Sequence, residues 1–540
     1  MTSAPRPRRL GGWGFEDERL EPSPAMLAWL AGRFAAGAPL PRFDPASAGA
    51  LSTPRALPAL PALSIDPLDR LAHARGQGLT DLVRLRSGTV PAAPDGVLRP
   101  GDAAAVAAAI EACDREGVPV VPWGGGTSVT GGVNAPISRR ADDPPRVVLD
   151  LARLAGLAAL DERSGLATFG AGTTGPGVEA ALAPHGLTLG HYPQSWELST
   201  VGGWIATRAS GQESLGFGRI EDLVAGVDAV APAGAIRVAP RPAVAIGPDP
   251  LGLLLGCEGR LAVLTAATLR VRPRPRERDV RAYLLPAWGE AIDTVRELTR
   301  AGIRLAMLRL SDPSETEVAM ATGLAGHALA GRALRTWLRL RGRRNYGCLL
   351  LLGAAGEPGE LWTAHGAARE ILRRYGAVAL GAGPGRRWLG ERFRHPYLRD
   401  ALLDRGIATD TFETSAPWSA LPALADTVRA ALPVPVLAHV SHPYRDGASL
   451  YFTFFFPCER EADATVARWA ELKRCATRAL LAAGGTLSHH HGVGSWHAPW
   501  YREAVGDALA AAVGGAAAAL DPRGTLNPGA LLDPADRLEV

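Results

Sequence analysis

The sequence predicts an α+β protein built of two lobes. Its 540 residues exceed what one hydrophobic core usually organises, and domains of roughly 100–200 residues each are expected. Apolar runs with strand character alternate with segments of helical periodicity along most of the chain. Between the two halves, residues 271–275 read Val-Arg-Pro-Arg-Pro. Because proline cannot donate to a strand ladder, this segment suits a boundary between the lobes.

The first lobe is expected to cover residues 92–275, after a proline- and arginine-rich N-terminal extension, residues 1–91, with a short helical patch at 25–35. The lobe begins with a β–α–β unit, in which an extended start at Val97 leads into a helix and a buried strand. The expected helices are 101–116 and 177–185, and the expected strands are 118–122, 146–151, 166–169, 222–231 and 261–270.

The second lobe is expected to cover residues 276–500, and the turn-dense segment 501–540 is expected to return to the first lobe. Strand-like runs alternate with amphipathic helices, which indicates helices that cover one face of a sheet. The expected strands are 304–310, 348–353 and 449–456, and the expected helices are 288–301, 360–375 and 464–483.

Composition and charge exclude several classes of protein. Hydrophobic residues make up 47% and charged residues 21%, the balance of a globular chain. The net charge of +4 is small and no basic run is interleaved with aromatic residues, so nucleic acid is not an expected partner. Five scattered cysteines favour neither a disulfide framework nor a zinc site. Without a secretory signal or a run of 18 apolar residues, a cytoplasmic setting is expected.

A glycine cluster directly follows the first buried strand. Residues 122–128 read Pro-Trp-Gly-Gly-Gly-Thr-Ser, so successive backbone N–H groups can converge on an anion without interference from Cβ atoms. A bare glycine triplet can equally be a tight surface turn. Hydroxyl-rich segments at 195–200 and 207–210, which flank Gly202 and Gly203, favour a cradle for the pyrophosphate of a nucleotide cofactor.

A second glycine motif spans residues 170–175, Gly-Ala-Gly-Thr-Thr-Gly, between an expected strand and an expected helix. It matches the G-x-G-x-x-G fingerprint of a dinucleotide-binding Rossmann unit. The acidic residue that should follow about 20 residues later is missing, because residues 187–191 read Leu-Thr-Leu-Gly-His. A nicotinamide cofactor is therefore not favoured.

The order of these motifs resembles a known family. Residues 122–132, 194–204, 220–224 and 256–259 are similar to the FAD lobe of flavoproteins of the vanillyl-alcohol oxidase type. Residues 199–211 and the N-terminal Gly11-Gly12-Trp13-Gly14-Phe15 resemble the alkyldihydroxyacetonephosphate synthases in particular. The resemblance implies an FAD-binding lobe of the PCMH type with two subdomains, and a cap domain whose antiparallel sheet is covered by helices.

By this resemblance the cofactor is FAD, and no motif for its covalent attachment is present. At Arg260 and Ala262 the family usually has small residues, and an arginine there could pair with the cofactor's phosphates. The implied FAD contacts are Pro122, Trp123, Gly124, Gly125, Gly126, Thr127, Ser128, His191, Gln194, Ser195, Trp196, Glu197, Leu198, Ser199, Thr200, Thr207, Arg208, Ala209, Ser210, Glu258, Gly259, Arg260, Leu261, Ala262, Val263 and Leu264.

A run of three histidines, His489, His490 and His491, lies before a Gly-Val-Gly turn in the second lobe. If the run is a strand, its side chains alternate between faces, so only one or two of them can reach a pocket and a three-histidine metal site is not expected. A solvated histidine run is the alternative. Related FAD-linked 2-hydroxyacid dehydrogenases carry a glutamate where His490 stands. This difference favours the synthases.

The resemblance also implies substrate-binding residues. Tyr451 falls where the synthases carry their catalytic tyrosine, and Arg309 and Arg399 match arginines that the family places over the substrate. A core tyrosine and surface ion pairs are the alternatives from residue type alone. Residues 413–418, Glu-Thr-Ser-Ala-Pro-Trp, resemble a further signature that shapes the pocket.

The implied reaction exchanges the acyl group of acyl-dihydroxyacetone phosphate for a long-chain alcohol, as in ether lipid biosynthesis, without net redox change. Tyr451 removes a proton beside the ketone, His490 exchanges protons, Arg399 holds the phosphate and Arg309 orients the headgroup. A 2-hydroxyacid oxidase or dehydrogenase, and a flavin-binding module without catalysis, are the alternative functions.

A lipid substrate would come from a bilayer, and residues 324–344 are a candidate for contact with one. Leucines and Trp337 alternate there with six arginines, a basic amphipathic pattern suited to an anionic surface. A soluble helix with a solvated face is the alternative, and a homodimer is left open.

Overall fold

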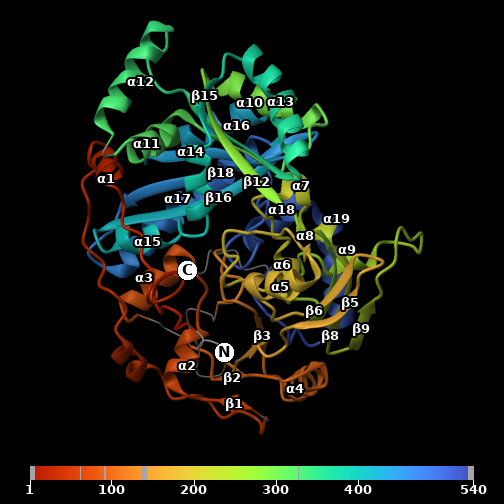
Figure 1. The fold of residues 1–540 in the computed structure, drawn as a ribbon. Coiled ribbons are helices and arrows are strands. Elements are labelled where there is room, and N and C mark those ends of the chain that lie inside the picture. Colours follow the sequence, from red (N-terminus) through yellow and green to blue (C-terminus); the bar gives the residue numbers. More distant parts are fainter. Residues whose placement is uncertain (1–5, 61, 90–92, 135–142, 326, 533–540) are drawn as a thin grey trace.

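The computed structural model describes residues 6–60, 62–89, 93–134, 143–325 and 327–532. The expected boundary between residues 91 and 92 lies outside this part of the chain. The described residues form two lobes, with the N-terminal segment running along both (Figure 1). No described helix is both long enough and apolar enough to cross a membrane.

A small sheet opens the first lobe, with the strand order β1-β2-β4-β3. Strands β2 and β3 both run parallel to β4, and helix α4 connects β2 to β3, so the expected β–α–β unit is confirmed. Asp102 caps α4, and the apolar face of this helix packs on the strands. The elements are β1 (Leu63–Ser64), β2 (Gly96–Leu98), α4 (Ala103–Arg115), β3 (Val120–Trp123) and β4 (Val147–Asp150).

A five-stranded antiparallel sheet completes the first lobe, with the order β5-β6-β10-β8-β9. Helices α5 and α6 pack on it. The expected strand at 222–231 begins two residues late, because the Asp222 carboxylate accepts the Arg219 N–H and draws Asp222 into helix α8. The elements are β5 (Leu157–Asp161), β6 (Leu166–Gly170), α5 (Gly175–Leu182), α6 (Val201–Thr207), α7 (Ser214–Phe217), α8 (Ile220–Leu223), β8 (Val224–Ala231), β9 (Gly234–Val238), α9 (Pro250–Leu254) and β10 (Val263–Arg270).

Seven antiparallel strands form the sheet of the second lobe, in the order β15-β12-β14-β13-β17-β18-β16. The three expected strands are present, and four others were not predicted. The seven strands are β12 (Glu277–Leu285), β13 (Met307–Ser311), β14 (Cys348–Gly356), β15 (Val378–Gly381), β16 (Ile407–Pro417), β17 (Val436–Pro443) and β18 (Gly447–Pro457). The proline-spaced segment before them contributes only β11 (Arg272–Pro273), which pairs with β7 (Leu187–Thr188).

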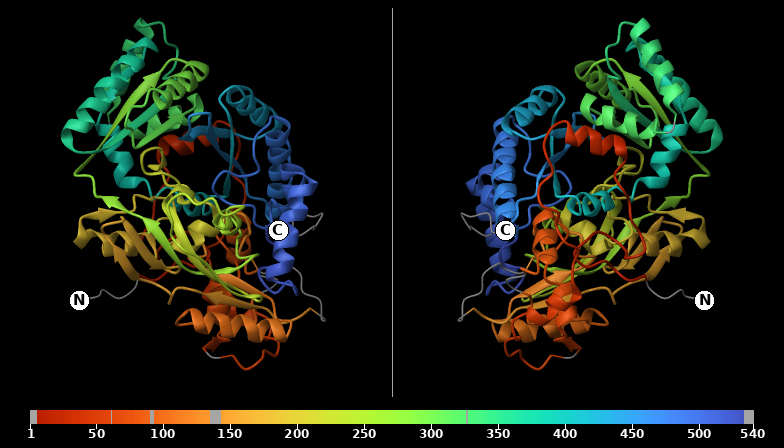
Figure 2. Two further views of the ribbon diagram at one scale, coloured as in Figure 1. Left: turned by 90° about the vertical axis from the view of Figure 1, so that its right-hand side faces the viewer. Right: turned by 90° about the vertical axis from the view of Figure 1, so that its left-hand side faces the viewer.

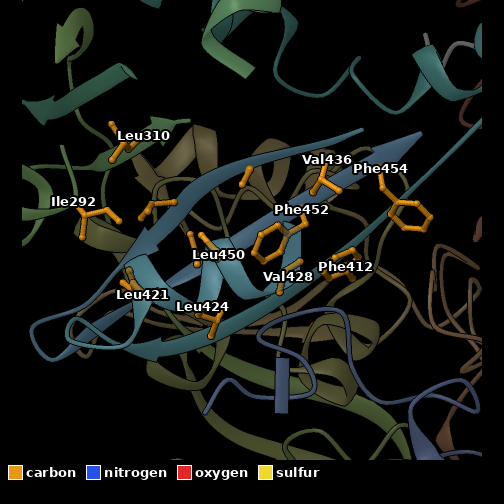
Figure 3. Packing of buried hydrophobic residues seen from close by; sticks show 14 of the residues in the cluster. Ile292, Leu310, Phe412, Leu421, Leu424, Val428, Val436, Leu450, Phe452 and Phe454 are labelled. Carbon is orange, nitrogen blue, oxygen red and sulfur yellow. The ribbon is translucent and has the colours of Figure 1, made fainter. Parts of the chain in front are cut away.

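Four helices cover one face of this sheet and form the main core with it (Figure 3). Along β18, Leu450, Phe452 and Phe454 point into that core, and the residues between them point to the opposite face. The expectation of helices over one face of a sheet is therefore confirmed. These helices are α10 (Trp288–Arg300), α13 (Pro358–Arg374), α16 (Leu421–Ala431) and α17 (Ala462–Ala482).

The opposite face of the sheet turns toward the first lobe, and shorter helices stand at its margins (Figure 2). They are α11 (Pro313–Gly323), α14 (Gly383–Glu391) and α15 (Tyr397–Leu403), with α12 (Ala328–Leu340) at the outer end. From the N-terminal segment, α1 (Pro24–Ala31) packs on α11, and α3 (Leu79–Arg86) contacts α17 and β16.

The last described residues lie on the first lobe. After α18 (Tyr501–Val505) and α19 (Asp507–Leu520), Leu526 forms a parallel bridge with Val120. Val120 donates its N–H to the Thr525 carbonyl at 2.8 Å, and Asn527 donates to the Val120 carbonyl at 2.8 Å. The chain end thus adds to the edge of the sheet that carries the glycine cluster.

Candidate active site

A cavity of about 1000 Å³ lies between the two lobes. Its floor belongs to the first lobe and includes residues from the segments 122–129 and 193–210, which comprise loops, the end of β3 and the helix α6. Its opposite wall is the uncovered face of the seven-stranded sheet. Arg309 and Arg399, the two arginines that the sequence assigned to the substrate, both line the cavity: Arg309 lies on this sheet wall and Arg399 on the helix α15 beside it.

The glycine cluster is packed too tightly for side chains. A Cβ atom on Gly125 would lie 2.0 Å from the Leu198 carbonyl oxygen, and one on Gly124 would lie 2.4 Å from the Thr200 hydroxyl. Gly126 adopts φ +64°, which favours glycine. The turn therefore presents backbone to the cavity. Such a surface suits the close approach of a pyrophosphate. The tight packing argues against the alternative of an exposed surface turn.

Most of the residues predicted to contact the cofactor line this cavity. They are Pro122, Trp123, Gly124, Gly125, Gly126, Thr127, Ser128, Gln194, Ser195, Ser199, Thr200, Thr207, Ala209, Ser210, Glu258, Gly259, Ala262, Val263 and Leu264. Seven others do not line it, namely His191, Trp196, Glu197, Leu198, Arg208, Arg260 and Leu261.

The structure gives a physical reason for several of these exceptions. Arg260 pairs with Asp521 of the C-terminal segment at 3.2 Å, so its guanidinium is turned toward that carboxylate and away from the cavity. Arg208 reaches the Leu255 carbonyl on the outside of α6. His191 is 1% exposed and packs edge-on against Trp204 in the core. These three side chains do not line the cavity, and their contact with the cofactor stays a prediction.

The sheet wall collects its polar residues through strand alternation. Arg309 on β13, His439 on β17 and Tyr451 on β18 all face the cavity, and their sequence neighbours face the helices. His439 and Tyr451 are directly paired across the strands, and their rings stack with centroids 5.0 Å apart. The Tyr451 hydroxyl donates to Thr411 Oγ1 at 3.0 Å. Tyr451 thus differs from a core tyrosine because its side chain lines the cavity, although its hydroxyl already has a partner.

Glu315 on α11 ties this group together. One of its carboxylate oxygens accepts from Arg309 at 2.5 Å, and the other lies 3.0 Å from His439 Nδ1. Although burial opposes ionisation, the charges of His439 and Arg309 lower the pKa of Glu315 to about 2. Arg309 is thus held in a defined position within the wall. Glu315 and His439 were not predicted: Glu315 is only six residues from Arg309, but the two unpredicted residues meet across 124 residues of sequence.

Arg399 lies on α15 and lines the cavity. Its Nε and Nη2 atoms are buried and have no hydrogen-bond partner among the described residues. A buried guanidinium without a partner is costly, so this site is suited to an anion. Asp400, the next residue, accepts from the Trp13 N–H at 2.9 Å and from Arg9 at 3.0 Å. The N-terminal segment, whose role the sequence left open, therefore holds the helix that carries Arg399.

The histidine run is a loop and not a strand. Glu413 on β16 accepts the backbone N–H groups of His489, His490 and His491, the last two at 3.0 and 2.9 Å. At the other end of the loop, Glu258 of the first lobe accepts from Val493 and Gly494 at 2.6 and 2.7 Å. The loop is thus clamped between a carboxylate of each lobe.

His490 and His491 line the cavity, whereas His489 does not. The expectation that one or two of the three reach the pocket is therefore confirmed, although the physical reason is a clamped loop. Burial lowers the pKa of His490 and of His491 to about 3, so both imidazoles are neutral near pH 7. Burial also raises the pKa of the Tyr451 phenol to about 12.

His442 on β17 joins His489 and His490 in a cluster whose donor nitrogens lie within 4.8 Å of one another. Those nitrogens already have partners: His442 Nδ1 lies 2.9 Å from the Ser214 hydroxyl, and His489 Nδ1 lies 2.9 Å from His490 Nδ1. These ring nitrogens are therefore engaged with neighbouring side chains and are not free to bind a metal ion. His442 was not predicted, because it belongs to an unpredicted strand.

Comparison with known proteins identifies both lobes. The model "FAD binding domain" matches residues 94–239, and the model "FAD linked oxidases, C-terminal domain" matches residues 274–531. The backbone-lined floor fits such a cofactor. Residues of the glycine turn, 194–200 and 207–210 would hold FAD.

Several proteins that are similar over most of the chain are alkyldihydroxyacetonephosphate synthases. The alkyldihydroxyacetonephosphate synthase of Dictyostelium discoideum is 30% identical over 453 residues, 81% of this chain and 73% of that protein. The enzyme of the same name from Trypanosoma brucei brucei is 30% identical over 87% of this chain and 78% of its own length. A solved structure of an alkyldihydroxyacetonephosphate synthase aligns with a TM-score of 0.80 at 25% identity, covering 96% of this chain and 98% of that one. The chain is an FAD-dependent enzyme and belongs to the alkyldihydroxyacetonephosphate synthase family.

Proposed function

We propose that the enzyme exchanges the acyl group of acyl-dihydroxyacetone phosphate for a long-chain alcohol. One observation carries this proposal: a single cavity combines three chemically different parts. These are the glycine floor, the buried Arg399 guanidinium with unpaired nitrogens, and an apolar end lined by residues such as Val318, Leu334 and Leu351. They suit a flavin, a phosphate and an alkyl chain respectively.

Arg399 is the proposed phosphate ligand. Its two unpaired nitrogens can donate to two oxygens of one phosphate, and burial strengthens such a contact. Arg309 already donates to Glu315, so it has less capacity for a doubly charged group and is assigned to the headgroup. The apolar end of the cavity is too hydrophobic for the phosphate and receives the hydrocarbon chain.

Tyr451 is the proposed base for the proton beside the ketone. With a pKa near 12 the phenol is neutral at pH 7, so it can take a proton only when another group accepts its own. The imidazoles of His491 and His490 flank it, with ring centroids at 5.5 and 6.0 Å. Bound FAD supplies an electron-accepting ring for the carbon that exchanges its substituent, without net redox change.

The overall exchange releases a proton. The bond between the substrate carbon and the acyl oxygen breaks, and the acyl group leaves as a carboxylate. The alcohol oxygen forms the new bond to that carbon and loses its hydrogen. At neutral pH, one proton must therefore leave the enclosed site in every turnover.

Incubation of the purified enzyme with acyl-dihydroxyacetone phosphate and hexadecanol tests the proposal. Mass spectrometry should detect the hexadecyl ether of dihydroxyacetone phosphate together with the released fatty acid. Fatty acid without ether would indicate hydrolysis and contradict the assignment.

A 2-hydroxyacid dehydrogenase is the second candidate, since it would use the same cofactor floor. Such an enzyme would reduce bound FAD when D-lactate or glycolate is added without oxygen, and the yellow colour would bleach. We expect no bleaching, because the position that carries a glutamate in those enzymes is occupied by the neutral imidazole of His490.

We further propose that α12 and its flanks contact an anionic membrane surface and admit the lipid. Leu324 and Leu334 line the cavity, whereas Leu329 and Leu340 are each 82% exposed on the same segment. Replacement of Arg332, Arg335 and Arg339 by glutamine should weaken sedimentation with vesicles that contain phosphatidylserine. Equal sedimentation of variant and wild type would refute this contact.

A further inference from the structure

We propose that Tyr444 and His489 form a proton relay that connects His490 in the cavity to solvent. The inference rests on the proposed function, because that reaction releases a proton inside an enclosed site. It assigns a role to Tyr444, which no motif singled out, and to His489, which does not line the cavity.

The relay is a chain of three side chains in direct contact. His490 Nδ1 lies 2.9 Å from His489 Nδ1, and His489 Nε2 lies 2.6 Å from the Tyr444 hydroxyl. Both ring nitrogens of His489 are thus engaged, one toward the cavity and one away from it. An imidazole bonded through both nitrogens can accept a proton at one and release it at the other.

The positions of the three residues support proton transfer from the cavity to solvent. His490 lines the cavity, and neither His489 nor Tyr444 does. His489 is 8% exposed, whereas Tyr444 is only partly buried and lies just beyond the end of β17, before the exposed Arg445 and Asp446. The three residues therefore lead from the buried reaction wall toward the surface.

The chain has two possible directions of hydrogen bonding. In one, His490 donates through Nδ1–H to His489, which donates through Nε2–H to the Tyr444 oxygen, and His490 Nε2 is left as an acceptor. In the other, Tyr444 donates to His489, which donates to His490. Transfer of one proton from His490 to solvent converts the first arrangement into the second, and rotation of the rings or hydroxyl restores it.

Burial keeps the two imidazoles of the chain neutral between transfers, and the nearby charges act in opposite directions. Glu413 lies 3.7 Å from His490 Nδ1 and favours a proton there. Arg219 donates to the His489 carbonyl at 2.8 Å and disfavours a positive charge on that ring. His442 stacks on His489 but bonds through Nδ1 to Ser210 and Ser214, so it supports the chain without extending it. Imidazoles that are neutral at rest can accept a proton at one nitrogen and release one at the other, and they do not remain protonated.

Tyr444→Phe tests the relay, because it removes the hydroxyl and keeps the ring. We expect kcat to fall about 10- to 100-fold in dilute buffer, with KM and FAD content unchanged. Imidazole at high concentration should restore kcat, since a small carrier can take the proton from His489. The kcat ratio between H2O and D2O should also rise. EDTA in every assay excludes an effect of a metal ion held by the histidine cluster.

Tyr375→Phe serves as the matched control, because Tyr375 is also partly buried but lies at the end of α13 on the helical side of the sheet. His489→Gln provides a second test and should likewise lower kcat and respond to imidazole. An unchanged kcat in Tyr444→Phe, or a loss that imidazole does not restore, would overturn the relay. A wild-type enzyme that forms no ether would instead refute the proposed function, and the relay with it.

Discussion

The two walls of the cavity are built by different means. The floor in the first lobe presents backbone and hydroxyl groups from loops such as 124–126, where side chains are sterically excluded. The sheet wall presents ionisable side chains, and each is fixed by a second residue: Arg309 by Glu315, Tyr451 by Thr411, and the histidine loop by Glu413. The comparison indicates that the floor binds the cofactor and the sheet wall carries out the chemistry. Substitutions in the two walls should therefore have separable effects on FAD binding and on turnover.

The largest difference between the effect on turnover and the effect on FAD binding is expected for Tyr451→Phe. Removal of the phenol hydroxyl should lower turnover about 1000-fold, because the proposed base is lost, and should leave FAD bound. Ether formation and flavin absorbance measured on one preparation check both halves. Tyr283→Phe is the control, since Tyr283 lies on β12 of the same sheet and packs in the helical core. Full activity in Tyr451→Phe would refute the assignment.

Gly125→Ala should weaken the binding of FAD to the floor of the cavity. Its Cβ would lie 2.0 Å from the Leu198 carbonyl, so the turn must shift, and FAD affinity should fall about 100-fold. Fluorescence titration of the apoprotein with FAD measures the change. Gly101→Ala is the control, because nothing lies within 4 Å of its Cβ position. Equal affinities would show that the glycine turn does not hold the cofactor.

Arg399→Lys should affect substrate binding and spare the cofactor. Lysine keeps the charge but cannot donate from two nitrogens in one plane, so the KM for acyl-dihydroxyacetone phosphate should rise roughly 30-fold, equivalent to about 2 kcal/mol. Steady-state kinetics test this, with Arg405→Lys as control, because Arg405 is exposed and lies two residues beyond the end of α15. An unchanged KM would place the phosphate elsewhere.

The smallest expected effect is on the pH dependence of the free energy of unfolding. The pKa of His490 is about 3 in the folded protein and near 6.5 when unfolded, so between these values the unfolded chain binds the extra proton. The free energy of unfolding should therefore decrease as pH falls from 7 to 5. His490→Asn should reduce this slope by up to about 1.4 kcal/mol per pH unit. Urea unfolding at pH 7, 6 and 5 measures the slope, and an unaltered slope would contradict a buried neutral His490.

The two walls also differ in how far the sequence predicts them. The glycine turn and the hydroxyl segments are local patterns, and most of the predicted cofactor contacts line the cavity. Arg260 does not line the cavity, because its partner Asp521 comes from a segment that is distant in the sequence. The general fold followed from strand and helix patterns, but strands such as β16 and β17 were missed.

The sheet wall required pairing information that no local pattern contains. Glu315 meets His439 only because α11 folds back beside β17. Glu413 meets the histidine loop across 75 or more residues of sequence. Tyr451, Arg309 and Arg399 were identified through resemblance to a family, since their residue types alone fit a core or a surface equally well.

The flavin content of Tyr451→Phe and Gly125→Ala, measured side by side with ether formation, tests the division between the two walls most directly. The division predicts a yellow but inactive protein for the change at the phenol, and a protein that regains activity only at high FAD concentration for the change at the glycine turn. A colourless Tyr451→Phe protein, or a wild type that stays colourless when FAD is supplied, would contradict it.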